Sequence, residues 1–118
     1  MAGLEVAGGG PIKLTPTQSL TLSMILHELG TNAAKYGAVS CPEGRVRISW
    51  LREPGQQNAP ERVRLCWEER EGPPVKPRAE RGFGSRLIEQ ACTYQLNGSA
   101  ELDFPSDGLT CRIVFPLG

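Results

Sequence analysis

A carboxylate, a carboxamide and an ammonium group recur at helical spacing within residues 27–38, as Glu28, Asn32 and Lys35. Steps of four and then three residues place such side chains one above another on a single helix face. Carboxylate and amide oxygens suit a magnesium ion that already holds phosphates, and an ammonium group neutralises phosphate oxygens. The pattern therefore indicates a site for a magnesium-bound triphosphate. The spacing alone also fits solvated surface charges with Asn32 as a bystander.

The helix that carries these groups has a recognisable start and an apolar stripe. Residues 15–18 form a capping box with proline at the first helical position, which predicts a helix beginning near Pro16. Gly37 is the expected residue just after its end. The apolar positions that repeat at helical spacing are Leu22, Ile25, Leu26, Leu29, Ala33 and Tyr36. One face of the helix is therefore expected to pack against a core.

The rest of the chain alternates strand patterns with one more helix. Strands are expected at 4–6 and 12–14 around a glycine turn, at 45–51 and 62–67, and at 100–104 and 109–115 as a closing hairpin. A second helix is expected over 83–96, and the proline- and glycine-containing residues 70–81 are the candidate lid. This order predicts one domain, 1–118, with the α/β fold of a two-layer sandwich, in which helices cover one face of a mixed, mostly antiparallel sheet.

Three motifs, in order along the chain, resemble those of the HWE group of sensor histidine kinases. Residues 27–38 resemble the N-box, Trp67-x-Glu69 resembles the Trp-x-Glu signature, and 81–89 resemble the glycine box before the last helix. The resemblance extends over 11–117. It implies the Bergerat fold shared by histidine kinases and gyrase-type ATPases, with the nucleotide between helices and lid. It also implies the ATP-binding catalytic domain of a two-component kinase, with ATP and Mg²⁺ as cofactors.

The resemblance implies partners as well. The γ-phosphoryl group of ATP would be transferred to a histidine on a separate dimerisation domain, and a response regulator would be the later partner. The single histidine of the chain, His27, lies in the N-box, so no acceptor histidine is expected here. Phosphoryl transfer is therefore expected to require the partner domain.

The resemblance assigns roles within the N-box. Asn32 is expected to ligate magnesium, and Lys35 to contact phosphate oxygens. Glu28 would help to hold the metal, act as a base, or do both, and the shared role is favoured. His27 is placed beside the nucleotide, with a packing or hydrogen-bonding role beside the site as the alternative. Tyr36 would border the nucleotide or fill the core.

The other two motifs are expected to bind the base and the phosphates. Glu69 would accept a hydrogen bond from the adenine amino group, whereas Trp67 is expected in the sheet core rather than stacked on the base. Gly82 and Gly84 precede a helix, where N–H groups and the helix dipole favour phosphate. The further contacts expected from these motifs are Gly72, Phe83, Ser85, Arg86 and Thr110. The alternative for Arg86 is a solvated charge on the helix. Glu71 stands where the family has glycine, which puts a close approach of the backbone to the base in doubt.

Composition excludes several other classes of function. The formal net charge is zero, which disfavours nucleic-acid binding, and no apolar run approaches the length of a membrane span. The N-terminus lacks the pattern of a signal peptide, so we expect a bacterial cytoplasmic domain without membrane contact. The four cysteines form no Cys-x-x-Cys pair, which favours reduced, mostly buried thiols over a zinc site.

Two alternatives remain open at this point. One is a degenerate domain of the same fold that no longer binds ATP and serves as a phosphotransfer or protein-interaction module. The other is a stand-alone ATPase or anti-sigma kinase of the same fold. Nucleotide binding separates the first alternative from the kinase, and steady phosphate release separates the second.

Overall fold

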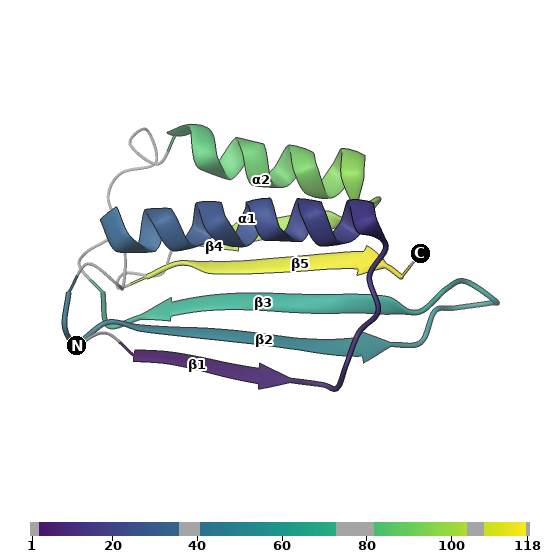
Figure 1. Ribbon diagram of the computed structural model, residues 1–118, viewed down its shortest axis with the longest axis horizontal. Helices are drawn as coiled ribbons and strands as arrows, with labels where there is room; N and C mark the ends of the chain where they lie inside the picture. The colour runs from purple at the N-terminus through teal and green to yellow at the C-terminus, as the bar shows by residue number, and fades with distance from the viewer. Residues whose placement is uncertain (1–2, 36–40, 73–81, 104–107, 118) are drawn as a thin grey trace.

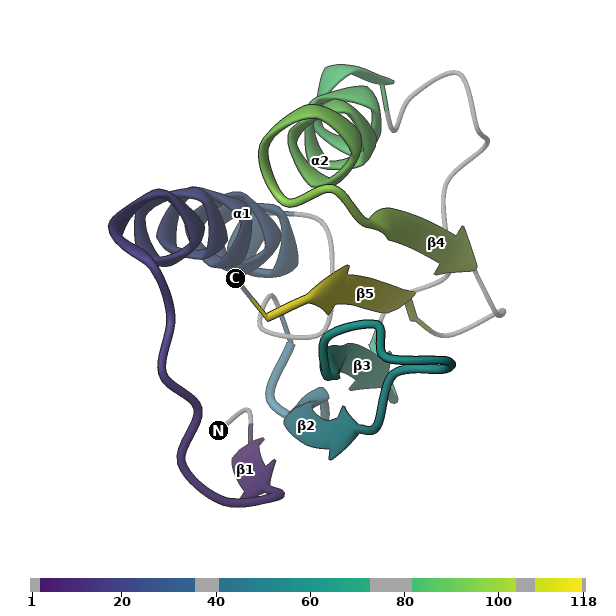
Figure 2. The ribbon, with the colours of Figure 1, turned by 90° about the vertical axis from the view of Figure 1, so that its right-hand side faces the viewer.

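The computed structural model describes residues 3–35, 41–72, 82–103 and 108–117, without the side chains of 82–85. One layer is a five-stranded sheet in the order β1-β2-β3-β5-β4, and two helices cover one of its faces (Figures 1 and 2). The elements are β1 (Gly3–Gly8), α1 (Pro16–Lys35), β2 (Arg45–Glu53), β3 (Arg62–Arg70), α2 (Gly82–Gln95), β4 (Ser99–Asp103) and β5 (Thr110–Pro116). The expected two-layer α/β sandwich is confirmed. Neither described helix is long and apolar enough to cross a membrane.

The sheet is mixed. β1 runs parallel to β2, whereas the pairs β2–β3, β3–β5 and β4–β5 are antiparallel. The mostly antiparallel sheet and the closing hairpin β4–β5 are therefore as predicted. Parallel neighbours need a crossover connection, and α1 provides it between β1 and β2.

The predicted strand at 12–14 is wrong, because residues 11–15 have no regular secondary structure. The chain must leave the sheet after β1 to reach the helix layer, so it cannot fold back as a hairpin. Gly10 turns the chain with a φ of 100°, and the indole N–H of Trp50 donates to its carbonyl oxygen at 2.9 Å. Ile12 and Leu14 then pack against the core without joining the strand ladder.

The start of α1 is fixed by the capping box that the sequence predicts. The backbone N–H of Gln18 donates to the Thr15 hydroxyl at 3.1 Å, and the N–H of Thr15 donates to the Gln18 side-chain oxygen at 3.0 Å. The Gln18 amide also donates to the Pro116 carbonyl at 2.9 Å. The cap therefore satisfies backbone groups of the first turn and also joins α1 to the end of β5.

The core lies between the helices and the covered face of the sheet. Alternate residues of the central strands point into it, because successive side chains of a strand face opposite sides. The largest fully buried apolar side chains are Phe115, Ile25, Leu29, Ile88, Leu96 and Ile113. The apolar positions predicted to face the core from α1 are all buried or half-buried within the described residues.

Two free thiols, Cys92 and Cys111, lie completely buried in this core. Burial raises the pKa of Cys92 from the ordinary 9.0 to about 11. Burial, with a smaller contribution from Cys92, raises the pKa of Cys111 to about 12. Cys41 and Cys66 are half-buried free thiols. Of the thiols expected to be mostly buried, two are therefore fully inside the core and two are half-buried.

These thiols predict a loss of stability in alkali. Above pH 9 the thiols of the unfolded chain ionise while the buried ones stay protonated, so the unfolded state binds fewer protons. The stabilisation is complete below pH 9 and decreases as the pH rises toward 11 or 12. We expect the unfolding free energy to fall by about 1.4 kcal/mol per pH unit for each thiol in that window.

Urea unfolding at pH 8 and pH 10 under reducing conditions measures this effect. Cys92→Ala is the control, because it removes one of the two thiols and should reduce the pH-dependent loss by about 1.4 kcal/mol per pH unit. The same loss in the wild-type and Cys92→Ala chains would show that Cys92 does not contribute to it.

Candidate functional site

Three elements meet at one side of the molecule, where α1 ends, β3 ends and α2 begins (Figure 1). The predicted site residues lie at these ends, on 28–35, on 69–72 and on 82–86. Segments that are far apart in the sequence are thus brought to a common edge. The geometry of each segment decides which of its side chains can serve a ligand there.

The side of α1 that carries Glu28, Asn32 and Lys35, here called the polar stripe, faces α2. The Thr21 hydroxyl donates to the side-chain oxygen of Gln95 on α2 at 3.0 Å. Glu28 follows Thr21 by two helical turns and Asn32 by three, so both stand on the same side of the helix. Both are half-buried, and Lys35 is exposed at the last helical residue. Within the described ranges, no side chain forms a hydrogen bond or ion pair with Glu28, Asn32 or Lys35.

His27 stands on a different side of α1. It is exposed, so its side chain does not pack in the core, and the hydrogen-bonding role considered for it stays a prediction. Its carbonyl oxygen accepts a hydrogen bond from the Thr31 hydroxyl at 2.8 Å. The place of the imidazole beside a nucleotide stays a prediction.

The end of β3 holds a buried carboxylate. Glu69 is 2% exposed and is the only charged side chain that is buried among the described residues. The Trp67 indole N–H donates to its Oε2 atom at 2.9 Å. Strand alternation places both side chains on the helix-covered face, as for the buried Val63 and Leu65. A buried carboxylate is costly unless it accepts hydrogen bonds, and here the indole supplies one.

The backbone at Glu69 is also held firmly. Its N–H donates to the Leu109 carbonyl at 2.7 Å, and its carbonyl accepts from the Arg70 guanidinium at 2.9 Å. Gly108 packs so closely on the Glu69 carbonyl that a Cβ atom there would collide with it. The carboxylate therefore extends from a backbone that is fixed on both sides.

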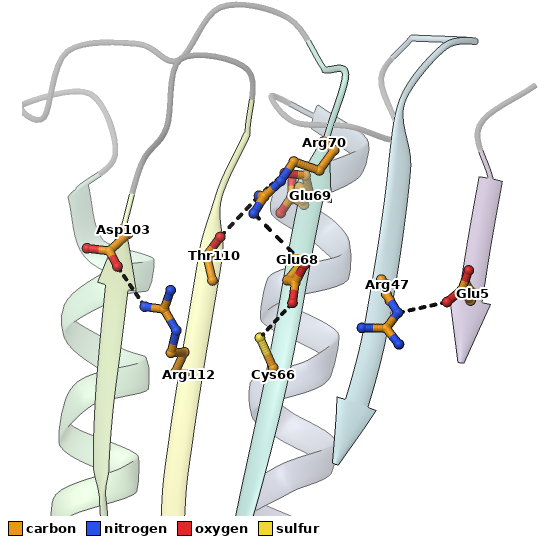
Figure 3. Close-up of polar contacts among 9 residues, drawn as sticks. All are labelled: Glu5, Arg47, Cys66, Glu68, Glu69, Arg70, Asp103, Thr110 and Arg112. Atoms are coloured by element: carbon orange, nitrogen blue, oxygen red, sulfur yellow. Dashed lines mark hydrogen bonds and ion pairs between the residues drawn. The ribbon is translucent and has the colours of Figure 1, made fainter. Parts of the chain in front are cut away.

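Thr110 lies at the same end of the sheet but on its other face. It stands opposite Glu68 in the ladder, and its buried hydroxyl accepts from the Arg70 guanidinium at 3.1 Å (Figure 3). The structure thus brings Glu69 and Thr110 to one edge without directing their side chains into one space. The direct contact between Thr110 and the nucleotide stays a prediction.

Comparison with known proteins identifies the family. No protein-family model matches the chain. In a match of 117 positions that covers 96% of the chain, it is 42% identical to blue-light-activated histidine kinase 1 of Erythrobacter litoralis (strain HTCC2594). The chain belongs to the histidine kinase family. It spans 31% of the length of that relative.

Solved histidine kinases share this fold. The kinase domain of the blue-light-activated histidine kinase EL346 of Erythrobacter litoralis has a TM-score of 0.74 at 17% identity, over 98% of this chain and 55% of that one. Full-length ShkA, in complex with AMPPNP, has a TM-score of 0.67 at 18% identity, over 99% of this chain and 26% of that one. At this identity the likeness shows the fold alone. It confirms the histidine-kinase fold that the three motifs imply.

Several predicted residues of the histidine kinase site lie partly or wholly outside the described structure. Tyr36 and most of the candidate lid are not described, whereas Gly72 is half-buried just after β3. The backbone of 82–85 forms the start of α2, but the side chains of this turn are not described. The four residues are Gly82, Phe83, Gly84 and Ser85. Arg86 follows on α2 and is exposed. Their contacts with phosphate stay predictions.

Glu71 takes the backbone conformation that a glycine would favour. Its φ is 58°, in the left-handed region, and its carboxylate pairs with the Arg45 guanidinium at 2.9 Å. Glu71 therefore takes a conformation open to glycine although it carries a side chain. Holding a side chain in this region costs about 1 kcal/mol.

This conformation predicts an unusual order of stability. Glu71→Gly should unfold with a free energy about 1 kcal/mol higher than Glu71→Ala, because only glycine adopts this φ without strain. Both variants lose the exposed ion pair with Arg45, which is worth at most about 1 kcal/mol and cancels in the comparison. Urea titration of the two variants measures the difference. An alanine variant as stable as the glycine variant would contradict the strain.

Sequence reasoning did not predict the contacts that two side chains make with Glu69 in the histidine kinase site. Trp67 is in the core as expected, yet its N–H also orients the Glu69 carboxylate. Arg70 holds the backbone of the same residue and the Thr110 hydroxyl. The two-residue spacing of Trp67 and Glu69 on a strand was a signal for the first contact, because such residues share a face. No local pattern announces the second.

Proposed function

We propose that the chain is the ATP-binding catalytic domain of a two-component sensor histidine kinase. It binds ATP with Mg²⁺ and transfers the γ-phosphoryl group to a histidine on the dimerisation domain. A response regulator then receives the phosphoryl group from this histidine. The observation that carries the proposal is the buried Glu69 carboxylate, held at the edge where the Glu28–Asn32 stripe of α1 and the start of α2 meet. ATP and the response regulator place this activity in the bacterial cytoplasm.

The residues at this edge fit a magnesium triphosphate. Asn32 and Glu28 offer half-buried oxygen atoms on one side of α1, which suits Mg²⁺ that retains phosphate and water ligands. Bound magnesium would offset charge on the phosphoryl oxygens. Lys35 adds a positive charge one turn further on, and the N–H groups at the start of α2 favour phosphate.

The chemistry proposed for this site is mainly positioning. Phosphoryl transfer requires an in-line arrangement of the donor and the attacking atom, with charge on the transferred group neutralised. Glu28 can accept the proton of the attacking imidazole, since its carboxylate stands beside the metal ligand Asn32 on the same stripe. The acceptor must come from the partner domain, because His27 is the only histidine of the chain.

Titration calorimetry with Mg²⁺ and a non-hydrolysable ATP analogue tests the proposal. Saturable heat at submillimolar nucleotide is expected. Absence of heat at millimolar nucleotide would contradict ATP binding and favour the protein-interaction module. Steady phosphate release by the chain in the absence of a dimerisation domain would favour the ATPase, and stable labelling of His27 would contradict transfer to a partner.

A further inference from the structure

The buried hydrogen bond between Trp67 and Glu69 joins two side chains of one strand face. Trp67 is 6% exposed and Glu69 is 2% exposed, and the Nε1–Oε2 distance is 2.9 Å. Indole is a donor only and an ionised carboxylate an acceptor only, so the direction of this bond is fixed. The last torsion of a glutamate side chain is broad, and a hydrogen bond to one oxygen restricts it. The indole therefore helps to orient the carboxylate.

We propose that Trp67 is a positioning residue that fixes the Glu69 carboxylate for the amino group of adenine and so makes the site prefer ATP to GTP. This inference rests on the proposed function, since it concerns the base of the same nucleotide. The adenine amino group donates to a carboxylate. Guanine presents a carbonyl oxygen at that position, which faces the carboxylate with lone pairs and is rejected.

The surroundings of Glu69 explain why the indole matters. Its N–H and carbonyl groups are already bonded, to Leu109 and Arg70, so the backbone cannot move to correct a misplaced carboxylate. The side-chain torsions are left, and the Trp67 N–H is one restraint on them. Loss of this donor removes that restraint and lowers the fraction of carboxylate orientations that meet the amino group. Affinity for ATP then falls, whereas the weak affinity for GTP changes little.

Trp67→Phe tests the inference, with Trp50→Phe as the matched control. Each substitution removes an indole N–H that donates at 2.9 Å, from Trp67 to Glu69 and from Trp50 to the Gly10 carbonyl. Trp50 stands opposite Leu65 in the ladder, whereas Glu69 stands opposite Val46, so the control acts four residues away along β2. Calorimetry with Mg²⁺ and non-hydrolysable analogues of ATP and GTP measures both affinities.

The expected result is a loss confined to one variant and one nucleotide. Trp67→Phe should weaken ATP binding about 10-fold, because the misoriented carboxylate loses its hydrogen bond with the adenine amino group, and a hydrogen bond to a charged group contributes about that much. GTP binding should change less than twofold, so the preference for ATP should fall by a similar factor of about 10. Trp50→Phe should leave both affinities unchanged.

A spectroscopic measurement supports the same test without reliance on packing. The chain has two tryptophans, so in the Trp50→Phe background Trp67 gives the one indole N–H resonance. This resonance should shift on addition of the ATP analogue and not of the GTP analogue. In the same background, benzothienylalanine replaces the N–H of Trp67 by sulfur at nearly constant volume and should reproduce the effect of Trp67→Phe.

The outcomes separate the two claims. If the wild-type chain gives no heat with ATP, the proposed function fails. If the wild type binds ATP and both Trp67 replacements keep its affinity and its preference over GTP, the positioning role is overturned while the proposed function stands. Equal losses for ATP and GTP would also overturn it, since they would indicate a general packing effect.

Discussion

Glu28→Ala should reduce phosphoryl transfer by a factor of about 100 to 10,000 and leave nucleotide affinity within a few fold. The reason is that Glu28 shares the α2-facing side of α1 with the proposed metal ligand Asn32, but adds base chemistry that matters only during transfer. The measurement is transfer of labelled phosphate from ATP to a histidine-bearing dimerisation domain, supplied as a separate chain. Calorimetry on the same variant gives the nucleotide affinity.

Two further variants sharpen this prediction. Glu28→Gln keeps an oxygen ligand and removes the base, so it should be as slow as Glu28→Ala if the base role dominates, and much faster if the metal role dominates. Glu89→Ala, at an exposed position of α2, is the control for loss of a helical glutamate. Wild-type turnover in Glu28→Ala would refute the assignment of Glu28.

The elements of the fold could be predicted where local chemistry determines them. The capping box at Thr15 and Gln18 forms both of its expected hydrogen bonds, and alternation predicts the strands that pack Val63 and Leu65 inward. Local alternation predicts a strand at 12–14 that does not form. Its apolar residues do pack, but the parallel pairing of β1 with β2 sends the chain across to α1 instead.

In the candidate site, too, local relations could be predicted and those set by strand pairing could not. Helical spacing correctly places Glu28 and Asn32 on one side of α1, because that relation is local. The face on which Thr110 stands depends on the register of β5 with β3, which pairs it with Glu68 and lies beyond local pattern. The conformation of Glu71 was hidden for a similar reason. The residue type argues against a positive φ, yet Glu71 takes one directly after the end of β3.

Glu69→Gln should weaken ATP binding about 100-fold, at the upper end of what a charged hydrogen bond contributes. The Trp67 N–H donates to the side chain in the structure, and in the proposed complex the adenine amino group donates as well. A carboxylate accepts at both of its oxygens, whereas a carboxamide turns an NH₂ group toward one of the two donors. The amide therefore satisfies the indole or the base, but not both.

The matched control is Glu68→Gln, one residue earlier on β3. Its side chain lies on the uncovered face of the sheet, where it pairs in the ladder with Arg47 and Thr110 (Figure 3). It carries the same change of charge and should bind ATP like the wild type. Calorimetry with the ATP analogue compares the two variants, and urea unfolding checks that Glu69→Gln remains folded. Equal ATP affinity of the two variants would show that Glu69 does not meet the base, because both make the same chemical change and only Glu69 lies on the helix-covered face.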